Sequence, residues 1–160
     1  MRASIDYTDA LRLPTRAGVA AGLAVLVATA LSLGSPLYAL VSAVIVSDLD
    51  PAQTRKLAIP RMIGTAVGAT IGCLATLIAQ PSAIAVTIGV LLPMFICQLF
   101  RRPAAAKVAG YVSGIIILSF ATDPWTHARD RLLETLLGIL AAAAISAVPP
   151  LYRRTKQERE

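Results

Sequence analysis

RMIGTAVGATIG, residues 61–72, opens a long apolar segment and combines a cation and a threonine with three regularly spaced glycines. The glycines recur at every fourth position, at Gly64, Gly68 and Gly72. In a helix this spacing places small residues on one face, where a second helix can approach closely. Helix packing is therefore the expected role of the three glycines, and a pore lined by exposed backbone is the alternative.

The same pattern returns in RLLETLLG, residues 131–138. Its arginine and threonine match those of the first stretch, so that Arg131 and Thr135 correspond to Arg61 and Thr65. Upstream of each copy, a short apolar run with a serine is followed by an Asp-Pro pair. These landmarks are Ser42 with Asp50-Pro51, and Ser113 with Asp123-Pro124. The chain therefore reads as two copies of one unit.

The composition is that of a membrane protein. Hydrophobic residues make up 56% of the 160 residues and charged residues only 15%, whereas about a quarter of a soluble domain is charged. The net charge of +6 does not predict nucleic-acid binding, because the basic residues lie in small clusters between apolar segments without interleaved aromatic residues. The lipid bilayer is the expected partner, and no nucleic acid is expected.

Six apolar segments, separated by proline, glycine and polar turns, predict six transmembrane helices. Their expected limits are about residues 15–33, 37–47, 60–79, 83–100, 104–121 and 130–151. A short surface helix is expected before the first span, over residues 1–13, and a polar tail after the last. The fold class is therefore an all-α integral membrane protein. One membrane domain covers residues 1–160, with three spans in each repeat, at about 14–79 and 82–151.

Charge predicts how the six spans are oriented. All but two of the 15 Lys and Arg residues fall on the side that holds both termini, and the exceptions are Arg129 and Arg131. Both termini are therefore expected in the cytoplasm, as in a multi-pass protein of the cell (inner) membrane. Because three spans are an odd number, the second repeat enters the membrane inverted relative to the first. Inverted repeats are typical of transporters.

Arg61 and Arg131 are the main candidates for function. Each is expected at the start of a long helix, Arg61 at the cytoplasmic face and Arg131 at the outer face, where free N–H groups and the helix dipole favour anions. A guanidinium at each end predicts a two-ended anion pathway. The alternative is that both side chains snorkel to lipid headgroups and orient their helices. Hydroxyl groups beside the pathway are expected from Ser42, Ser113, Thr65 and Thr135.

Two carboxylates are candidates for coupling transport to a proton. Asp48 follows the second span, where pairing with Arg55 or Lys56 is the alternative. Glu134 lies three residues after Arg131, where an intrahelical ion pair is the simplest explanation. The sequence contains no metal-ligand cluster, nucleotide-binding loop or nucleophile triad. Neither an enzyme nor a metal or cofactor site is therefore expected.

With these motifs in six spans, the chain resembles the fusaric-acid-resistance and aromatic-acid-exporter superfamily, which also includes the plant aluminium-activated malate transporters. The resemblance covers about residues 14–151. It rests on Ser42-Ala43-Val44, on Arg61-x-x-Gly64-Thr65-x-x-Gly68-x-x-x-Gly72 and on Arg131 to Gly138. It implies export of small organic anions, notably aromatic carboxylates, or anion conduction through an oligomer. We therefore expect a homo-oligomeric exporter, with a passive anion channel or a non-transporting accessory subunit as alternatives.

Overall fold

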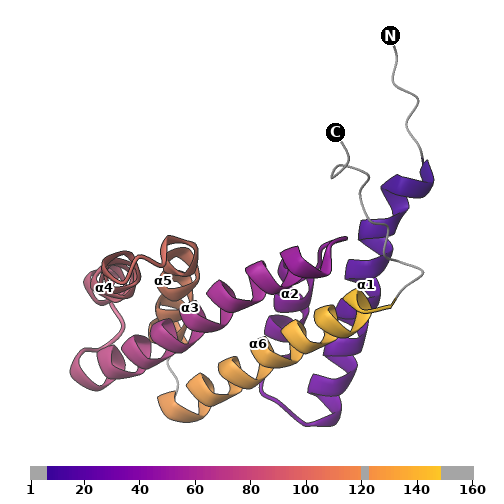
Figure 1. Cartoon of the computed structure of the whole chain (residues 1–160). Coiled ribbons are helices and arrows are strands. Elements are labelled where there is room, and N and C mark those ends of the chain that lie inside the picture. Colours follow the sequence, from indigo (N-terminus) through magenta and orange to yellow (C-terminus); the bar gives the residue numbers. More distant parts are fainter. Residues whose placement is uncertain (1–6, 120–122, 149–160) are drawn as a thin grey trace.

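The computed structural model describes residues 7–119 and 123–148, with side chains from residue 11 onward. Within these residues it contains six α-helices and no strand, so the predicted all-helical class is confirmed (Figure 1). The helices are α1 (Tyr7–Ala30), α2 (Pro36–Val46), α3 (Pro51–Ile78), α4 (Ala83–Leu99), α5 (Pro103–Leu118) and α6 (Pro124–Ser146). The first six residues, the helix ends expected at 121 and 151, and the polar tail lie outside the described residues.

The long helices α3 and α6 each begin directly after an aspartate cap. Asp50 accepts a hydrogen bond from the N–H of Ala52 at 2.9 Å, and Asp123 accepts one from the N–H of Thr126 at 3.3 Å. The Thr126 hydroxyl also donates to Asp123, and these bonds hold the pKa of its carboxyl below the usual value. The later starts expected for both helices are therefore wrong, because the polar turn ahead of each apolar run belongs to the same helix.

α1 also begins earlier than expected. It is continuous from Tyr7 through Pro14 to Ala30, so the separate surface helix predicted ahead of the first span is wrong for residues 7–13. A proline inside a helix removes one hydrogen bond, but it does not end this helix.

The first helix of each half ends in the same way. Ser32 after α1 and Arg101 after α4 both have a positive φ, 53° and 54°. After α1, the N–H of Leu33 reaches back to the carbonyl of Ala28 at 3.1 Å, and the equivalent bond after α4 is 2.8 Å. This Schellman arrangement satisfies carbonyls that the last helical turn leaves without partners. A helix beginning with proline follows in both halves.

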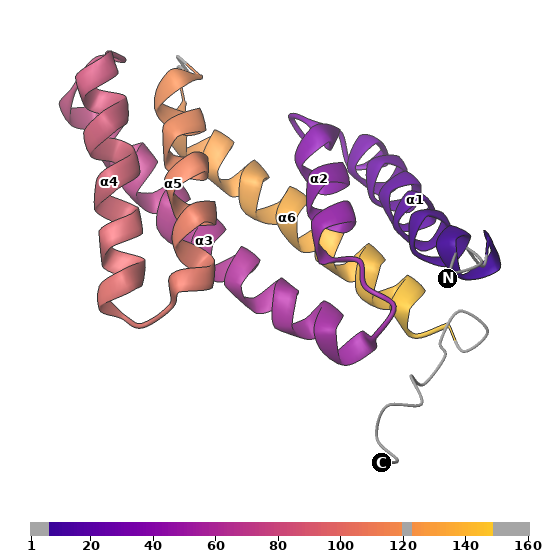
Figure 2. The same ribbon diagram turned by 90° about the horizontal axis from the view of Figure 1, so that it is seen from above.

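The two long helices lie side by side in the centre, with α4 and α5 at one end of the molecule and α1 and α2 at the other (Figure 2). α3 and α6 run antiparallel. The Thr54 hydroxyl near the start of α3 lies 3.0 Å from that of Ser146 at the end of α6. Further along, the hydroxyls of Thr65 and Thr135 are 3.5 Å apart. The middle of each long helix therefore lies against the middle of the other.

Glycines bring the short helices α2 and α5 against the long ones. A Cβ atom at Gly68 of α3 would overlap the carbonyl oxygen of Ala109 in α5, and the other two glycines of the ridge face the same helix. A Cβ atom at Gly138 of α6 would likewise overlap the carbonyl oxygen of Ala39 in α2. Since larger residues would force these helices apart, the glycines fix how closely α5 packs on α3 and α2 on α6.

Small side chains fill the interior, and large apolar ones cover the outside. The buried hydrophobic residues are mostly alanines, whereas Ile78, Ile84 and Phe100 are 87%, 73% and 72% exposed. This distribution is typical of helices that pack in lipid through small residues. Two segments, Leu11–Ala30 and α3, are long and apolar enough to span a bilayer by length and composition; α2, α4 and α5 are apolar but shorter.

Candidate functional site

Both predicted arginines lie inside their helices. Arg61 is about three turns from the start of α3, and Arg131 is about two turns from the start of α6. The helix N-termini, with their free N–H groups, therefore lie about 10–15 Å along the axis from the backbone of the two arginines. The prediction that a helix N-terminus contributes to anion binding beside each arginine is wrong, because the aspartate caps start the helices earlier in the chain.

Arg61 is a buried cation that neutral groups hold in place. Its side chain extends from α3 to both short helices, and the residue is only 4% exposed. Nε donates a hydrogen bond to Oγ of Ser42 in α2 at 3.0 Å, and Nη1 donates to the hydroxyl oxygen of Tyr111 in α5 at 2.8 Å. The guanidinium carbon lies 5.9 Å from the centre of the Tyr111 ring. Among the described residues, no carboxylate forms an ion pair with Arg61.

Arg131, by contrast, has its own counter-ion. Nη1 lies 3.5 Å from Oε2 of Glu134, one turn further along α6. The guanidinium also stacks on the ring of Tyr38 in α2, 3.1 Å from its centre. Glu134 is 1% exposed, and its other oxygen accepts a hydrogen bond from the N–H of Ser35 at 2.6 Å. The charge of Arg131 is therefore balanced within a cluster that joins α6, α2 and the linker before α2.

The two arginine clusters are neighbours. Tyr38 and Ser42 are one helical turn apart on α2, so the points at which Arg131 and Arg61 contact this helix differ by about 6 Å along its axis. The prediction that the arginines lie at opposite faces of a hydrocarbon core about 30 Å thick is therefore wrong. Instead, both guanidinium groups contact one face of α2 near the middle of the molecule.

Ser113 and Asp48 belong to neither cluster. Ser113 is fully buried where α5 packs on Gly72 of α3, and its hydroxyl has no hydrogen-bond partner among the described residues. Asp48 lies in the linker before α3, where it accepts a hydrogen bond from the N–H of Asp50 at 2.9 Å and acts electrostatically on Arg16. The structure therefore brings together Ser42, Thr65, Thr135 and the two arginine clusters, without these two residues.

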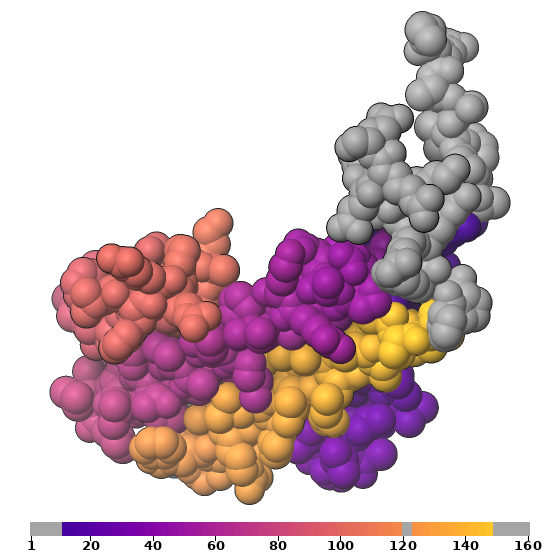
Figure 3. Space-filling view, viewed as in Figure 1, coloured from indigo at the N-terminus to yellow at the C-terminus, as the bar shows by residue number. Residues whose placement is uncertain are grey.

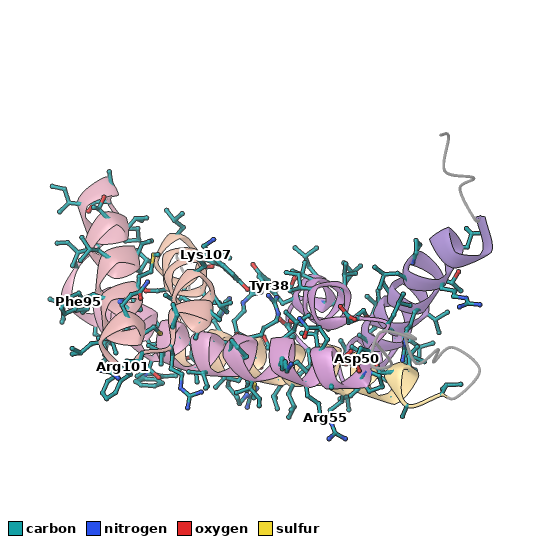
Figure 4. The ribbon with its side chains drawn as sticks, turned by 45° about the horizontal axis from the view of Figure 1, so that its top comes forward. Tyr38, Asp50, Arg55, Phe95, Arg101 and Lys107 are labelled. Atoms are coloured by element: carbon teal, nitrogen blue, oxygen red, sulfur yellow. The ribbon has the colours of Figure 1, made fainter. Side chains whose placement is uncertain are left out.

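The surface above the central helices is hollowed. Figure 3 shows the hollow between α5 on one side and α2 with the first turns of α3 on the other. Tyr38 projects from α2 on the side that faces α5 (Figure 4). Arg61 bridges the same two helices through Ser42 and Tyr111. Tyr38 and the Arg61 cluster thus lie where the two short helices face each other.

A comparison with protein families decides the class of this chain. The model of the fusaric acid resistance protein-like family matches residues 23–145, which is most of the chain. The chain belongs to the fusaric acid resistance protein-like family. The resemblance expected from the motifs is therefore confirmed. Searches among curated proteins and among solved structures gave no match.

Membership in the fusaric acid resistance protein-like family assigns the chain to a class of membrane transport proteins. Within this class, polar groups inside the membrane usually belong to a substrate or ion pathway. The family match covers all six helices at least in part, from residue 23 in α1 to residue 145 in α6.

Sequence reasoning missed the two tyrosines. Tyr38 lies four residues before Ser42, and Tyr111 lies two residues before Ser113, so they do not occupy matching positions in the two copies. The internal repeat therefore gave no signal for them. Helical spacing was the available signal for Tyr38, since residues four apart share a face. Nothing in the sequence indicated that Tyr111 contacts Arg61 of the other half.

Arg16 is one of the basic residues expected on the side of the termini, and the structure places it in the packed interior. The residue is 1% exposed. Its Nη1 donates to the carbonyl oxygen of Leu49 at 3.0 Å, and its Nη2 donates to that of Ile145 at 3.4 Å. Cations are favourable near the carbonyls at the end of a helix. Arg16 thus ties α1 to the linker before α3 and to the last turn of α6.

Proposed function

We propose that this protein exports small organic anions, aromatic carboxylates in particular, across the cytoplasmic membrane, and that Arg61 binds their carboxylate group. The supporting observation is that Arg61 is buried and has only neutral partners among the described residues. An arginine in the centre of a bilayer costs about 2.5–3.5 kcal/mol or more. A transported anion would supply the missing counter-charge and offset part of this cost.

The partners of Arg61 leave hydrogen-bond donors for such an anion. The hydroxyl oxygens of Ser42 and Tyr111 both accept from the guanidinium, so each hydroxyl hydrogen points away from it and can donate to another acceptor. A guanidinium has five N–H donors, of which the structure assigns two. Planar carboxylates match the donor geometry of arginine. Carboxylates are therefore the class of anion that fits the cluster best.

Arg131 would serve as a second step on the same path. An anion that moves from Arg61 to Arg131 competes there with Glu134, which already forms an ion pair with this arginine. Neutralisation of Glu134 by a proton would remove that competition. Glu134 is therefore a better candidate than Asp48 for coupling transport to a proton gradient, since Asp48 contacts neither arginine cluster.

We also propose that the two halves are inverted repeats of three spans each. Matching residues of the two copies, Thr65 and Thr135, contact each other, as residues beside a two-fold axis do. Each short helix also packs on the corresponding long helix of the other half, α5 on α3 and α2 on α6, with three ridge glycines facing α5 and Gly138 facing α2. Shared aspartate caps and Schellman ends support the same relation.

Cytoplasmic location of both termini is proposed from the positions of the basic residues. The bonds of Arg16 to Ile145 and of Thr54 to Ser146 place the first half of α1, the start of α3 and the end of α6 at one end of the molecule. Arg55 and Lys56 lie at this end, in the first turns of α3. An excess of Lys and Arg marks the cytoplasmic side of a membrane protein.

Efflux of 4-hydroxybenzoate from loaded proteoliposomes tests the proposal. Arg61→Ala is expected to lower the rate about tenfold or more, because a hydrogen bond to a charged group contributes about 1.5–3 kcal/mol. Arg131→Ala is expected to lower the rate less, since Glu134 already balances this arginine. The matched control is Arg129→Ala, which removes an arginine with a side chain that is 68% exposed and should leave the rate unchanged.

The same assay separates the alternatives. Efflux that requires an imposed pH gradient supports a coupled exporter, whereas efflux at the same rate without a gradient supports a passive anion channel. No efflux of any anion from wild-type proteoliposomes would contradict transport by this chain alone and would favour an accessory role. Unchanged efflux in Arg61→Ala would contradict the assignment of Arg61.

A further inference from the structure

Tyr111 is the more exposed member of the contact between α5 and Arg61. Arg61 is 4% exposed, whereas Tyr111 is 38% exposed. The Tyr111 hydroxyl accepts a hydrogen bond from Nη1 of Arg61, and its ring lies 5.9 Å from the guanidinium carbon. One part of this side chain therefore contacts the buried cation, and another part remains exposed. The contact lies between α5 and α2, which flank the hollow in Figure 3.

The second arginine also contacts a tyrosine, through the face of its ring. Tyr38 covers Arg131 with its ring. Each arginine thus contacts a tyrosine from the opposite half of the chain, Arg61 of α3 with Tyr111 of α5 and Arg131 of α6 with Tyr38 of α2. Because the sequence positions of the two tyrosines do not match, this arrangement is additional to the internal repeat.

A further cation precedes Tyr111 on its helix. Lys107 is exposed, and it lies four residues before Tyr111, so both side chains share one face of α5. Figure 4 labels Lys107 on this helix. An anion that approaches along this face of α5 meets a solvated positive charge before it meets Tyr111, whose hydroxyl contacts the buried guanidinium of Arg61.

We propose that Tyr111 is the specificity-determining residue of the Arg61 site, and that it selects carboxylates attached to an aromatic ring. This inference rests on the proposed function. A carboxylate displaces the Tyr111 hydroxyl from Nη1, because a charged acceptor binds a guanidinium more strongly than a neutral one. The displaced phenol ring stays beside the site and packs against the aromatic ring of the substrate. A carboxylate without an aromatic ring gains only the contact with Arg61.

The test compares two anions of similar size and equal charge, 4-hydroxybenzoate and 4-hydroxycyclohexanecarboxylate, in proteoliposome efflux over a range of concentrations. The wild-type protein is expected to show a KM for the aromatic anion that is about 3- to 10-fold lower, the range that an aromatic pair contributes. Tyr111→Phe keeps the ring and should keep this preference. Tyr111→Leu should raise the KM of the aromatic anion to that of its saturated analogue and leave the KM of the analogue nearly unchanged.

Two further variants complete the test. Tyr111→Met fills the same space with a flexible side chain and should lose the preference for the aromatic anion, as Tyr111→Leu does. If Tyr111→Leu cannot be produced, Tyr111→Met takes its place in the test. Leu118→Ala, at an exposed position of the same helix, should keep the preference. A purely structural role of Tyr111 would instead change both KM values or the maximal rates together.

The outcomes distinguish this inference from the proposed function. If wild-type protein moves both anions with equal KM, or if Tyr111→Leu keeps the aromatic preference, the role of Tyr111 is overturned and transport at Arg61 stands. If the wild-type protein moves neither anion, the proposed function fails and the role of Tyr111 fails with it.

Discussion

Glu134 shows how one buried charge can hold several elements together. Its two carboxylate oxygens bind the N–H of Ser35 and the guanidinium of Arg131, which in turn lies against Tyr38 of α2. A buried carboxylate is stable only when such partners replace the water it has lost. Arg61 has no equivalent carboxylate among the described residues, and this difference in charge balance is why we assign the two arginines different roles.

Glu134→Ala is expected to destabilise the protein strongly, because it leaves Arg131 without its counter-charge and the N–H of Ser35 without an acceptor. Breaking a buried ion pair in this way costs about 3–5 kcal/mol. Thermal unfolding in detergent, followed by circular dichroism, should show a clearly lower midpoint. Glu134→Gln keeps an acceptor for Ser35 and should show a smaller decrease.

The control for this measurement is Arg129→Ala. Arg129 forms an exposed pair with Asp130, and such pairs contribute about 0–1 kcal/mol, so the midpoint should hardly change. Equal midpoints for Glu134→Ala and the wild-type protein would contradict the structural role of the Glu134 cluster.

At the scale of the helices, glycine position matters more than glycine content. The ridge glycines of α3 lie against α5, where an added Cβ atom has no space. Gly22 of α1 has open space around the same position. Replacing glycine by alanine is therefore expected to affect stability differently at Gly68 and Gly22. Where nothing obstructs the new methyl group, alanine is more favourable than glycine within a helix by about 0.8–1 kcal/mol.

Gly68→Ala is expected to lower stability, because the new methyl group overlaps the backbone of α5 and overpacking of this kind costs about 1–3 kcal/mol. Gly22→Ala is expected to leave the stability unchanged or to raise it slightly. The unfolding midpoint of each purified variant in the same detergent provides the comparison. A Gly68→Ala protein as stable as Gly22→Ala would show that α3 and α5 do not pack as closely as described.

The helices were predictable from local chemistry, but their contacts were not. Apolar runs bounded by proline and glycine located all six, and Asp50 and Asp123 were identified as markers of the repeat. The helix starts were placed too late because charged residues lower the hydropathy of the first turns of α3 and α6, although these turns have good caps. This error also displaced Arg61 and Arg131 to the helix ends.

The candidate site could be predicted only in part. Of the residues that the repeat selected, Arg61 and Ser42 form a hydrogen bond, and Thr65 and Thr135 contact each other. Ser113 lies apart from them, because a shared sequence position does not ensure the same neighbours when the helix face differs. The role of Tyr111 depends on how α5 packs on α3, a contact between distant segments that no local pattern encodes.

At the scale of the whole molecule, α3 and α6 form the central pair of helices. α4 and α5 pack on α3, and α1 and α2 pack on α6. Hydrogen bonds tie the central pair at one end through Thr54, in the middle through Thr65, and at the other end through Cys73, which donates to the carbonyl of Pro124 at 3.1 Å. The short helices α2 and α5 pack on this pair from opposite halves (Figure 2). The buried cation therefore lies where both halves meet, which is where transporters built from inverted repeats place their substrate sites.

Equilibrium binding of 4-hydroxybenzoate to the purified protein in detergent, measured by isothermal titration calorimetry, is the decisive measurement for Arg61. The wild-type protein and Arg129→Gln should bind with equal Kd. Arg61→Gln, with unchanged circular dichroism, should bind about tenfold more weakly or not at all, because it removes the positive charge that Ser42 and Tyr111 hold in place. Equal affinity in Arg61→Gln and the wild-type protein would contradict the anion site proposed at Arg61.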